Sequence, residues 1–172
     1  KTVGPIRRNL GLRTFFNMLG PIVNPAKPAY QLIGVYNLEM ARIYNYAMQS
    51  LGKEFTLIHS LDGYDEISLT SDTKIISNKG EFIMTPYQLG KRKVFPEELY
   101  GGNTVEAAAT LFKKIIQGNG SWSQNAVVLA NAAMALQLTG QYENYEAAFQ
   151  AAVKSLESGA ANHCLNQLIS LQ

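Results

Sequence analysis

The pattern of apolar and polar positions predicts strands in the first half of the chain and helices in the second. Apolar runs at residues 30–36 and 55–59 flank a helical pattern, which begins after Asn37 as N-cap, continues to Leu51 and ends at Gly52. A strand, a helix and a second strand in this order form a βαβ unit with parallel strands. We therefore expect one such unit over residues 30–59.

Two further strands are expected at residues 73–76 and 81–84. The residues between them include Asn78 and Gly80, which tolerate the positive φ angles of a tight hairpin turn. Such a hairpin adds antiparallel pairing to the parallel unit. The fold class predicted from the sequence is therefore α/β, with a mixed, mainly parallel sheet, flanking helices and a helical C-terminal part.

Helical spacing accounts for most of the remaining chain. Each predicted helix has a good N-cap residue before it or a glycine just beyond it. The expected helices cover residues 12–19, which Gly20-Pro21 terminates, then 104–117, 123–139 and 145–158, with a short last helix after Asn162. The alanine-rich stretch at 126–135 suits close packing of its helix against a neighbour.

The composition is that of a packed globular protein. Hydrophobic residues make up 47% of the 172 residues and charged residues 16%, which excludes a disordered chain. A single cysteine, Cys164, allows neither an internal disulfide framework nor a structural zinc site. No apolar run approaches the ~20 residues that span a bilayer. We expect a soluble, cytoplasmic protein without a membrane partner.

Charge is concentrated at the start of the chain. The formal net charge is +2, and Lys1, Arg7, Arg8 and Arg13 contribute +4, so the chain after Arg13 carries a net −2. This balance does not point to nucleic acid as a partner. The basic start either binds an anion, for which the arginine guanidinium is well shaped, or is a solvated chain start.

An acidic loop is the strongest local signal for chemistry. Asp62, Asp65 and Glu66 follow the second predicted strand, at the edge of an α/β sheet where ligands bind. Their hard carboxylate oxygens suit Mg²⁺ beside a phosphorylated substrate, whereas the alternative is a solvated acidic turn. His59, just before the loop, could act as a general base, but a hydrogen-bonded structural histidine is the favoured interpretation.

The segment Gly20-Pro21, followed by Asn24-Pro25, is the second candidate. Such a turn can present backbone groups to a flat ligand or can be purely structural, and the residues alone leave both open. The chain contains no Walker loop, dinucleotide-binding glycine fingerprint, kinase signature or nucleophile elbow. From its residues alone, it is an α/β domain with a candidate Mg²⁺-carboxylate loop.

One long segment carries a family resemblance. Residues 5–26, PIRRNLGLRTFFNMLGPIVNPA, resemble the signature of anthranilate phosphoribosyltransferases, and the likeness continues in QLIGVY at 31–36, His59-Ser60, GYDEISL at 63–69 and Gly101-Gly102. The resemblance implies transfer of the phosphoribosyl group of phosphoribosyl pyrophosphate to the amine of anthranilate in tryptophan biosynthesis, with release of pyrophosphate. Pyrimidine nucleoside phosphorylases share the broad architecture but lack the RTFFNMLGP run at 13–21.

The resemblance also implies the site residues. Arg7 matches the arginine near the anthranilate carboxylate, and Gly20 and Pro21 match the turn that lines the anthranilate tunnel. Asp65 and Glu66 match the acidic pair that holds Mg²⁺ on the diphosphate. No protein nucleophile is expected, since an oxocarbenium-like transition state depends on charge neutralisation of the leaving group and on orientation of the amine.

The family pattern extends beyond this chain. Its glycine-rich diphosphate loop and its small helical domain precede the position of Lys1. We therefore expect residues 1–172 to be the carboxyl part of a single α/β catalytic domain, inactive alone, with the full-length protein a homodimer. The remaining alternative is a noncatalytic, nucleic-acid-binding paralogue, which the net −2 after Arg13 disfavours.

Overall fold

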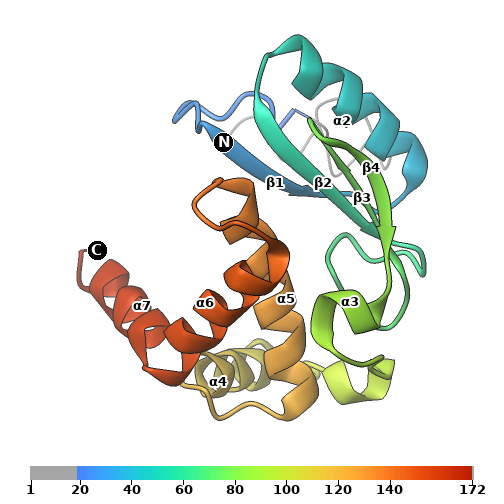
Figure 1. Cartoon of the computed structure of the whole chain (residues 1–172). Helices are drawn as coiled ribbons and strands as arrows, with labels where there is room; N and C mark the ends of the chain where they lie inside the picture. The colour runs from blue at the N-terminus through green and yellow to red at the C-terminus, as the bar shows by residue number, and fades with distance from the viewer. Residues whose placement is uncertain (1–18, 172) are drawn as a thin grey trace, which may run out of the picture.

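The computed structural model describes residues 19–171, and its first half is a four-stranded sheet (Figure 1). The strands are β1 (Tyr30–Gly34), β2 (Glu54–Ser60), β3 (Thr73–Ser77) and β4 (Gly80–Met84), in the order β1-β2-β3-β4. β1 and β2 are parallel, with Ile33 opposite Leu57. The pairs β2-β3 and β3-β4 are antiparallel. The mixed sheet is confirmed, but within the described residues antiparallel pairs outnumber the parallel pair, so this part is not mainly parallel.

The predicted βαβ unit and hairpin are both present. The crossover helix is α2 (Leu38–Ser50), and the Asn37 side chain caps it by accepting a 2.8 Å hydrogen bond from the Met40 amide. Gly80, at φ +123°, begins the return strand of the hairpin. The Asn78 side chain accepts from the Phe55 amide at 2.9 Å and so ties the hairpin turn to the start of β2.

The helical part begins after the sheet. The elements are α3 (Pro86–Gly90), the 3₁₀ turn η2 (Pro96–Leu99), α4 (Val105–Ile116), α5 (Trp122–Leu138), α6 (Tyr145–Glu157) and α7 (Ala160–Ser170). The predicted helices at 104–117, 123–139 and 145–158 are confirmed, and the last helix begins slightly earlier than expected. The pattern did not predict α3 and η2, which are single turns too short for a periodicity. The predicted helix at 12–19 lies almost wholly outside the described residues.

Helices cover both faces of the sheet. α2 packs on one face through Ala41, Tyr44 and Met48, against Phe55 and Leu57 of β2. α5 packs on the other, where Ala126, Ala130 and Met134 form one core with Ile58 of β2 and with Ile67 and Leu69 of the following loop. β2 is therefore buried along nearly its whole length, including its polar residues Thr56, His59 and Ser60.

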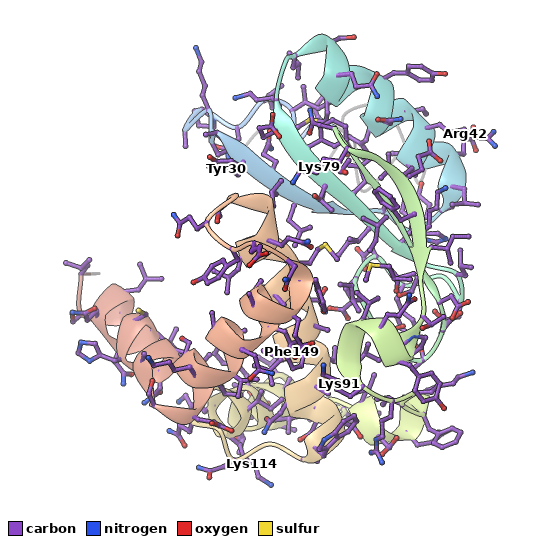
Figure 2. The ribbon with its side chains drawn as sticks, in the orientation of Figure 1. Tyr30, Arg42, Lys79, Lys91, Lys114 and Phe149 are labelled. Carbon is purple, nitrogen blue, oxygen red and sulfur yellow. The ribbon has the colours of Figure 1, made fainter. Side chains whose placement is uncertain are left out.

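α6 packs on α5 through Ala133, Ala148 and Phe149. Lys91, at the end of α3, reaches α6 by an ion pair with Glu146, and its Nζ lies 5.6 Å from the centre of the Phe149 ring (Figure 2). α5 is therefore the central helix that joins the sheet to the helical part. Among the described residues, no helix is long and apolar enough to cross a membrane.

Candidate active site at the carboxyl edge of the sheet

The carboxyl ends of β1 and β2 form one edge of the sheet, and the acidic loop begins there. Just beyond β1, the Val35 amide donates to the Ile58 carbonyl at 2.9 Å, and the Val35 carbonyl lies 2.8 Å from His59 Nδ1. His59 is buried. This hydrogen bond joins the two strand ends and agrees with the interpretation of His59 as a hydrogen-bonded structural residue.

The acidic loop folds back against the end of β1. A Cβ atom added to Gly34 would lie only 1.7 Å from the carbonyl oxygen of Asp65, a backbone atom. Glycine therefore permits a close approach that any other residue at position 34 would obstruct. This contact places the acidic pair beside the end of β1.

Asp65 and Glu66 are both exposed at the tip of this loop. Partial burial, together with the negative charge of Asp65, raises the pKa of the Glu66 carboxyl. Within residues 19–171 neither carboxylate has a hydrogen bond or an ion pair with another side chain. Two adjacent, unpaired carboxylates fit the donor set of a hard cation such as Mg²⁺, whose charge would relieve their mutual repulsion.

Asp62 has a different role from the acidic pair. Its carboxylate accepts a hydrogen bond from the Thr70 hydroxyl. The hydroxyl groups of Thr70 and Ser68 are in turn hydrogen-bonded to each other at 2.7 Å. In the described part of the chain no three His, Cys, Asp or Glu side chains gather into a metal-binding group. The three carboxylates grouped by sequence spacing therefore separate into an exposed pair and a carboxylate that stabilises the loop.

A chain of hydroxyl groups underlies the loop. The fully buried Ser60 hydroxyl donates to the Glu66 carbonyl at 2.6 Å, and the Ser68 hydroxyl donates to the Ser60 oxygen at 3.1 Å. From α5, the Asn131 side chain accepts from the Ile67 amide at 3.0 Å and donates to the Ile67 carbonyl at 2.8 Å. Sequence reasoning missed Asn131, although a lone amide within the alanine-rich stretch at 126–135 was a usable signal.

Gly20 and Pro21 lie in a turn ahead of β1, where the Ile22 and Val23 amides both donate to the Leu19 carbonyl at 2.9 Å. Gln31 of β1 donates to the Pro21 carbonyl at 2.6 Å and so fixes the turn on the strand. Pro21 lines an open pocket of about 450 Å³, whose wall includes Gly34, whereas the exposed Gly20 is not part of that wall. Pro21 and the acidic loop thus both adjoin β1, and Arg7 lies outside the described residues.

Residues 1–162 match the family described as "Glycosyl transferase family, a/b domain". The chain belongs to this glycosyltransferase family. That membership agrees with the mixed α/β fold and with the resemblance found in the signature at residues 5–26.

The relatives within the glycosyltransferase family carry a more specific name. The chain is 48% identical, over 99% of its length, to an anthranilate phosphoribosyltransferase of Christiangramia forsetii, and 49% identical to the one of Flavobacterium johnsoniae. It spans 51% and 52% of these two proteins. The chain is thus about half as long as the curated relatives that it matches.

Solved structures agree in fold. The anthranilate phosphoribosyltransferase of Thermus thermophilus superposes with a TM-score of 0.86 at 30% identity, covering 98% of this chain and 50% of that one. The enzyme of Saccharomyces cerevisiae, solved in complex with PRPP and Mg, gives 0.85 at 26% identity, with 98% and 48% covered. The same yeast enzyme was also solved with 4-fluoroanthranilate.

Proposed function

We propose that this chain is the carboxyl part of the catalytic domain of a cytoplasmic anthranilate phosphoribosyltransferase, and that the full-length protein is a homodimer. The observation that carries the proposal is the exposed Asp65-Glu66 pair at the carboxyl edge of the sheet. It occurs in a chain 48% identical to a relative of that name, with the fold of an enzyme solved with PRPP and Mg. The substrates are anthranilate and phosphoribosyl pyrophosphate, with Mg²⁺ as cofactor.

In the proposed reaction, the anthranilate nitrogen forms a bond to the anomeric carbon of the ribose while the bond from that carbon to the diphosphate oxygen breaks. The diphosphate leaves with the bonding electron pair, and the nitrogen passes one proton to solvent water. Mg²⁺, if held there, would supply positive charge against the negative charge that develops on the leaving diphosphate. Asp65 and Glu66 hold that assembly at the edge of the sheet, and Pro21 with Gly20 orients the aromatic substrate so that its amine faces the sugar.

Arg7 completes the proposed site by binding the anthranilate carboxylate, since a guanidinium can donate two parallel hydrogen bonds to it. Replacing Arg7 with Ala in the full-length protein is expected to raise the KM for anthranilate more than the KM for phosphoribosyl pyrophosphate. Steady-state kinetics with each substrate varied in turn measure the two effects. Equal effects on both substrates would instead assign Arg7 a structural role.

Loss of anthranilate fluorescence in the presence of phosphoribosyl pyrophosphate and Mg²⁺ tests the reaction itself, in the protein with its upstream residues present. The Asp65→Asn and Glu66→Gln variants are expected to lower Mg²⁺-dependent turnover by about 100-fold or more. Each variant removes one proposed carboxylate ligand of the Mg²⁺ that would neutralise the diphosphate. Glu97→Gln, which changes an exposed acid of η2 outside the acidic loop, serves as the control. An unchanged Mg²⁺ dependence in both variants would remove the acidic pair from the site.

A further inference from the structure

Asn131 is a polar residue in an apolar helix. It lies in α5 beside Ala130, which is fully buried, and one turn before Met134, which is nearly so. Asparagine is a poor residue for a helix interior, since it has a low helix propensity and an amide that loses hydration when covered. Its presence at this point of the central helix calls for a compensating set of hydrogen bonds.

The structure supplies that set in full. Asn131 Oδ1 accepts from the Ile67 amide at 3.0 Å, and Nδ2 donates to the Ile67 carbonyl at 2.8 Å and to the Val127 carbonyl at 2.9 Å. The reversed amide orientation would set Nδ2 against an N–H donor and Oδ1 against two carbonyl oxygens. The orientation of the side chain is therefore fixed, and it pairs with Ile67 as a neighbouring strand would.

The same peptide group is held from its other side. The Glu66 carbonyl and the Ile67 amide belong to one peptide plane, whose oxygen accepts from Ser60 at 2.6 Å and whose N–H donates to Asn131. The Ile67 side chain is fully buried in the core that includes Ala126 and Ala130. The backbone leaving Glu66 is thus fixed by β2 on one side and by α5 on the other.

Within the described residues, the acidic side chains themselves have no comparable support. Neither Asp65 nor Glu66 has a side-chain hydrogen bond or ion pair within residues 19–171, so their direction depends on the backbone that carries them. We propose that Asn131 is a positioning residue, which orients the Glu66-Ile67 peptide and thereby aims the Asp65-Glu66 pair at the metal. The proposal rests on the proposed function, because it takes that pair as the Mg²⁺ ligands.

The test uses Asn131→Leu in the full-length protein, since leucine keeps the branch at Cγ and removes all three side-chain hydrogen bonds. Residues that orient metal ligands without touching the metal change metal affinity by ~10–100-fold. We therefore expect the Mg²⁺ concentration for half-maximal turnover, at fixed phosphoribosyl pyrophosphate, to rise by about tenfold or more. Asn144→Ala is the matched control, because it removes the N-cap of α6 without touching the loop.

A second readout does not depend on activity. Hydrogen exchange of the Ile67 amide is expected to be at least about tenfold faster in Asn131→Leu than in Asn144→Ala at equal global stability. Ser60→Ala, which removes the other support of the same peptide, is expected to shift the Mg²⁺ midpoint in the same direction. If Asn131→Leu fails to fold, Asn131→Asp takes its place, because it keeps the acceptor for the Ile67 amide and loses both donated hydrogen bonds.

The outcomes separate this proposal from the function on which it rests. If Asp65→Asn shifts the Mg²⁺ midpoint and Asn131→Leu leaves it unchanged, Asn131 is not a positioning residue. A midpoint that neither Asp65→Asn nor Glu66→Gln moves would instead overturn the assignment of the metal ligands. If Asn131→Leu and Asn144→Ala shift the midpoint equally, the effect is one of general stability and the proposal is wrong.

Discussion

Gly34 shows how the absence of one side chain determines the shape of the site. Its φ is not positive, so the backbone itself does not require glycine, and an alanine could adopt the same conformation. The requirement is steric, because the Asp65 carbonyl occupies the place of a Cβ atom. The obstructing atom belongs to the backbone, so it cannot turn aside as a flexible side chain would.

Gly34→Ala is therefore expected to displace the acidic loop from the end of β1. Overpacking of this kind costs ~1–3 kcal/mol of stability, and it is expected also to lower Mg²⁺-dependent turnover in the full-length protein. Denaturant unfolding and the Mg²⁺ titration measure the two effects. Gly101→Ala is the control, because an added Cβ there meets no atom within 4 Å. Equal stability of the two variants would show that the close approach carries no cost.

The hydroxyl oxygen of Tyr145 allows a second prediction at the scale of one residue. Its hydroxyl lies 2.8 Å from the Leu89 carbonyl and 3.2 Å from the Ala130 carbonyl, and so links α6 to α3 and α5. Burial raises the pKa of Tyr145, so the hydroxyl remains a donor across the neutral range. Tyr145→Phe is expected to lower the free energy of unfolding by about 1–2 kcal/mol, measured by urea titration. The Tyr142 hydroxyl has no such hydrogen bond within residues 19–171, so Tyr142→Phe is expected to lower the free energy of unfolding by clearly less.

At the scale of elements, α5 is the helix that contacts the sheet, α6 and η2. Its small buried residues, Ser123, Ala126, Ala130 and Ala133, let the sheet and α6 approach it closely from two sides. Its first turn is also tied to η2, because the Ser123 hydroxyl donates to Glu98 at 2.7 Å. Arg92 donates to the same carboxylate at 3.0 Å and lies 4.0 Å from the centre of the Trp122 ring.

The hydrogen bonds of Glu98 make the stability of the first turn of α5 depend on pH. The Phe95 amide, then the Ser123 hydroxyl and then Arg92 hold the pKa of Glu98 below its ordinary value. A lowered folded-state pKa means that the stabilisation is present above the unfolded value and is lost as the pH falls through the folded value. Glu98→Gln is expected to lower the melting temperature at neutral pH, with the difference from wild type vanishing in acid. A difference that persists unchanged at pH ~3 would contradict this link.

Local patterns predicted the elements better than the contacts between them. Apolar periodicity and capping residues correctly indicated the βαβ unit, the hairpin and the three long helices, because those signals act within a few residues of the chain. The site depends on longer-range contacts, which no spacing rule contains. Asn131 is hydrogen-bonded to Ile67, which is 64 positions away in the sequence. Asp62 accepts a hydrogen bond from Thr70 and does not group with Asp65 and Glu66.

At the scale of the whole molecule, two helices of the described residues, α4 and α7, leave large apolar side chains exposed. α4 has no buried residue, and its Val105 and Phe112 are 80% and 52% exposed. α7 likewise has none, and its Leu168 and Ile169 are more than half exposed. Large exposed apolar side chains are typical of interaction surfaces where they gather into a patch. They agree with the proposal that these residues are one part of a longer protein.

The 172-residue chain alone is therefore expected to show no turnover of anthranilate with phosphoribosyl pyrophosphate and Mg²⁺. The acidic pair supplies one side of the proposed diphosphate site, and the family resemblance implies that the other side, a glycine-rich loop, lies upstream. Without that loop the diphosphate lacks the contacts that the resemblance assigns to it, and the orientation on which the reaction depends is lost. Anthranilate fluorescence measures the rate, with circular dichroism to show that the chain is folded and the full-length protein as the positive control. Turnover by the chain alone at the rate of the full-length protein would show that residues 1–172 contain the whole site.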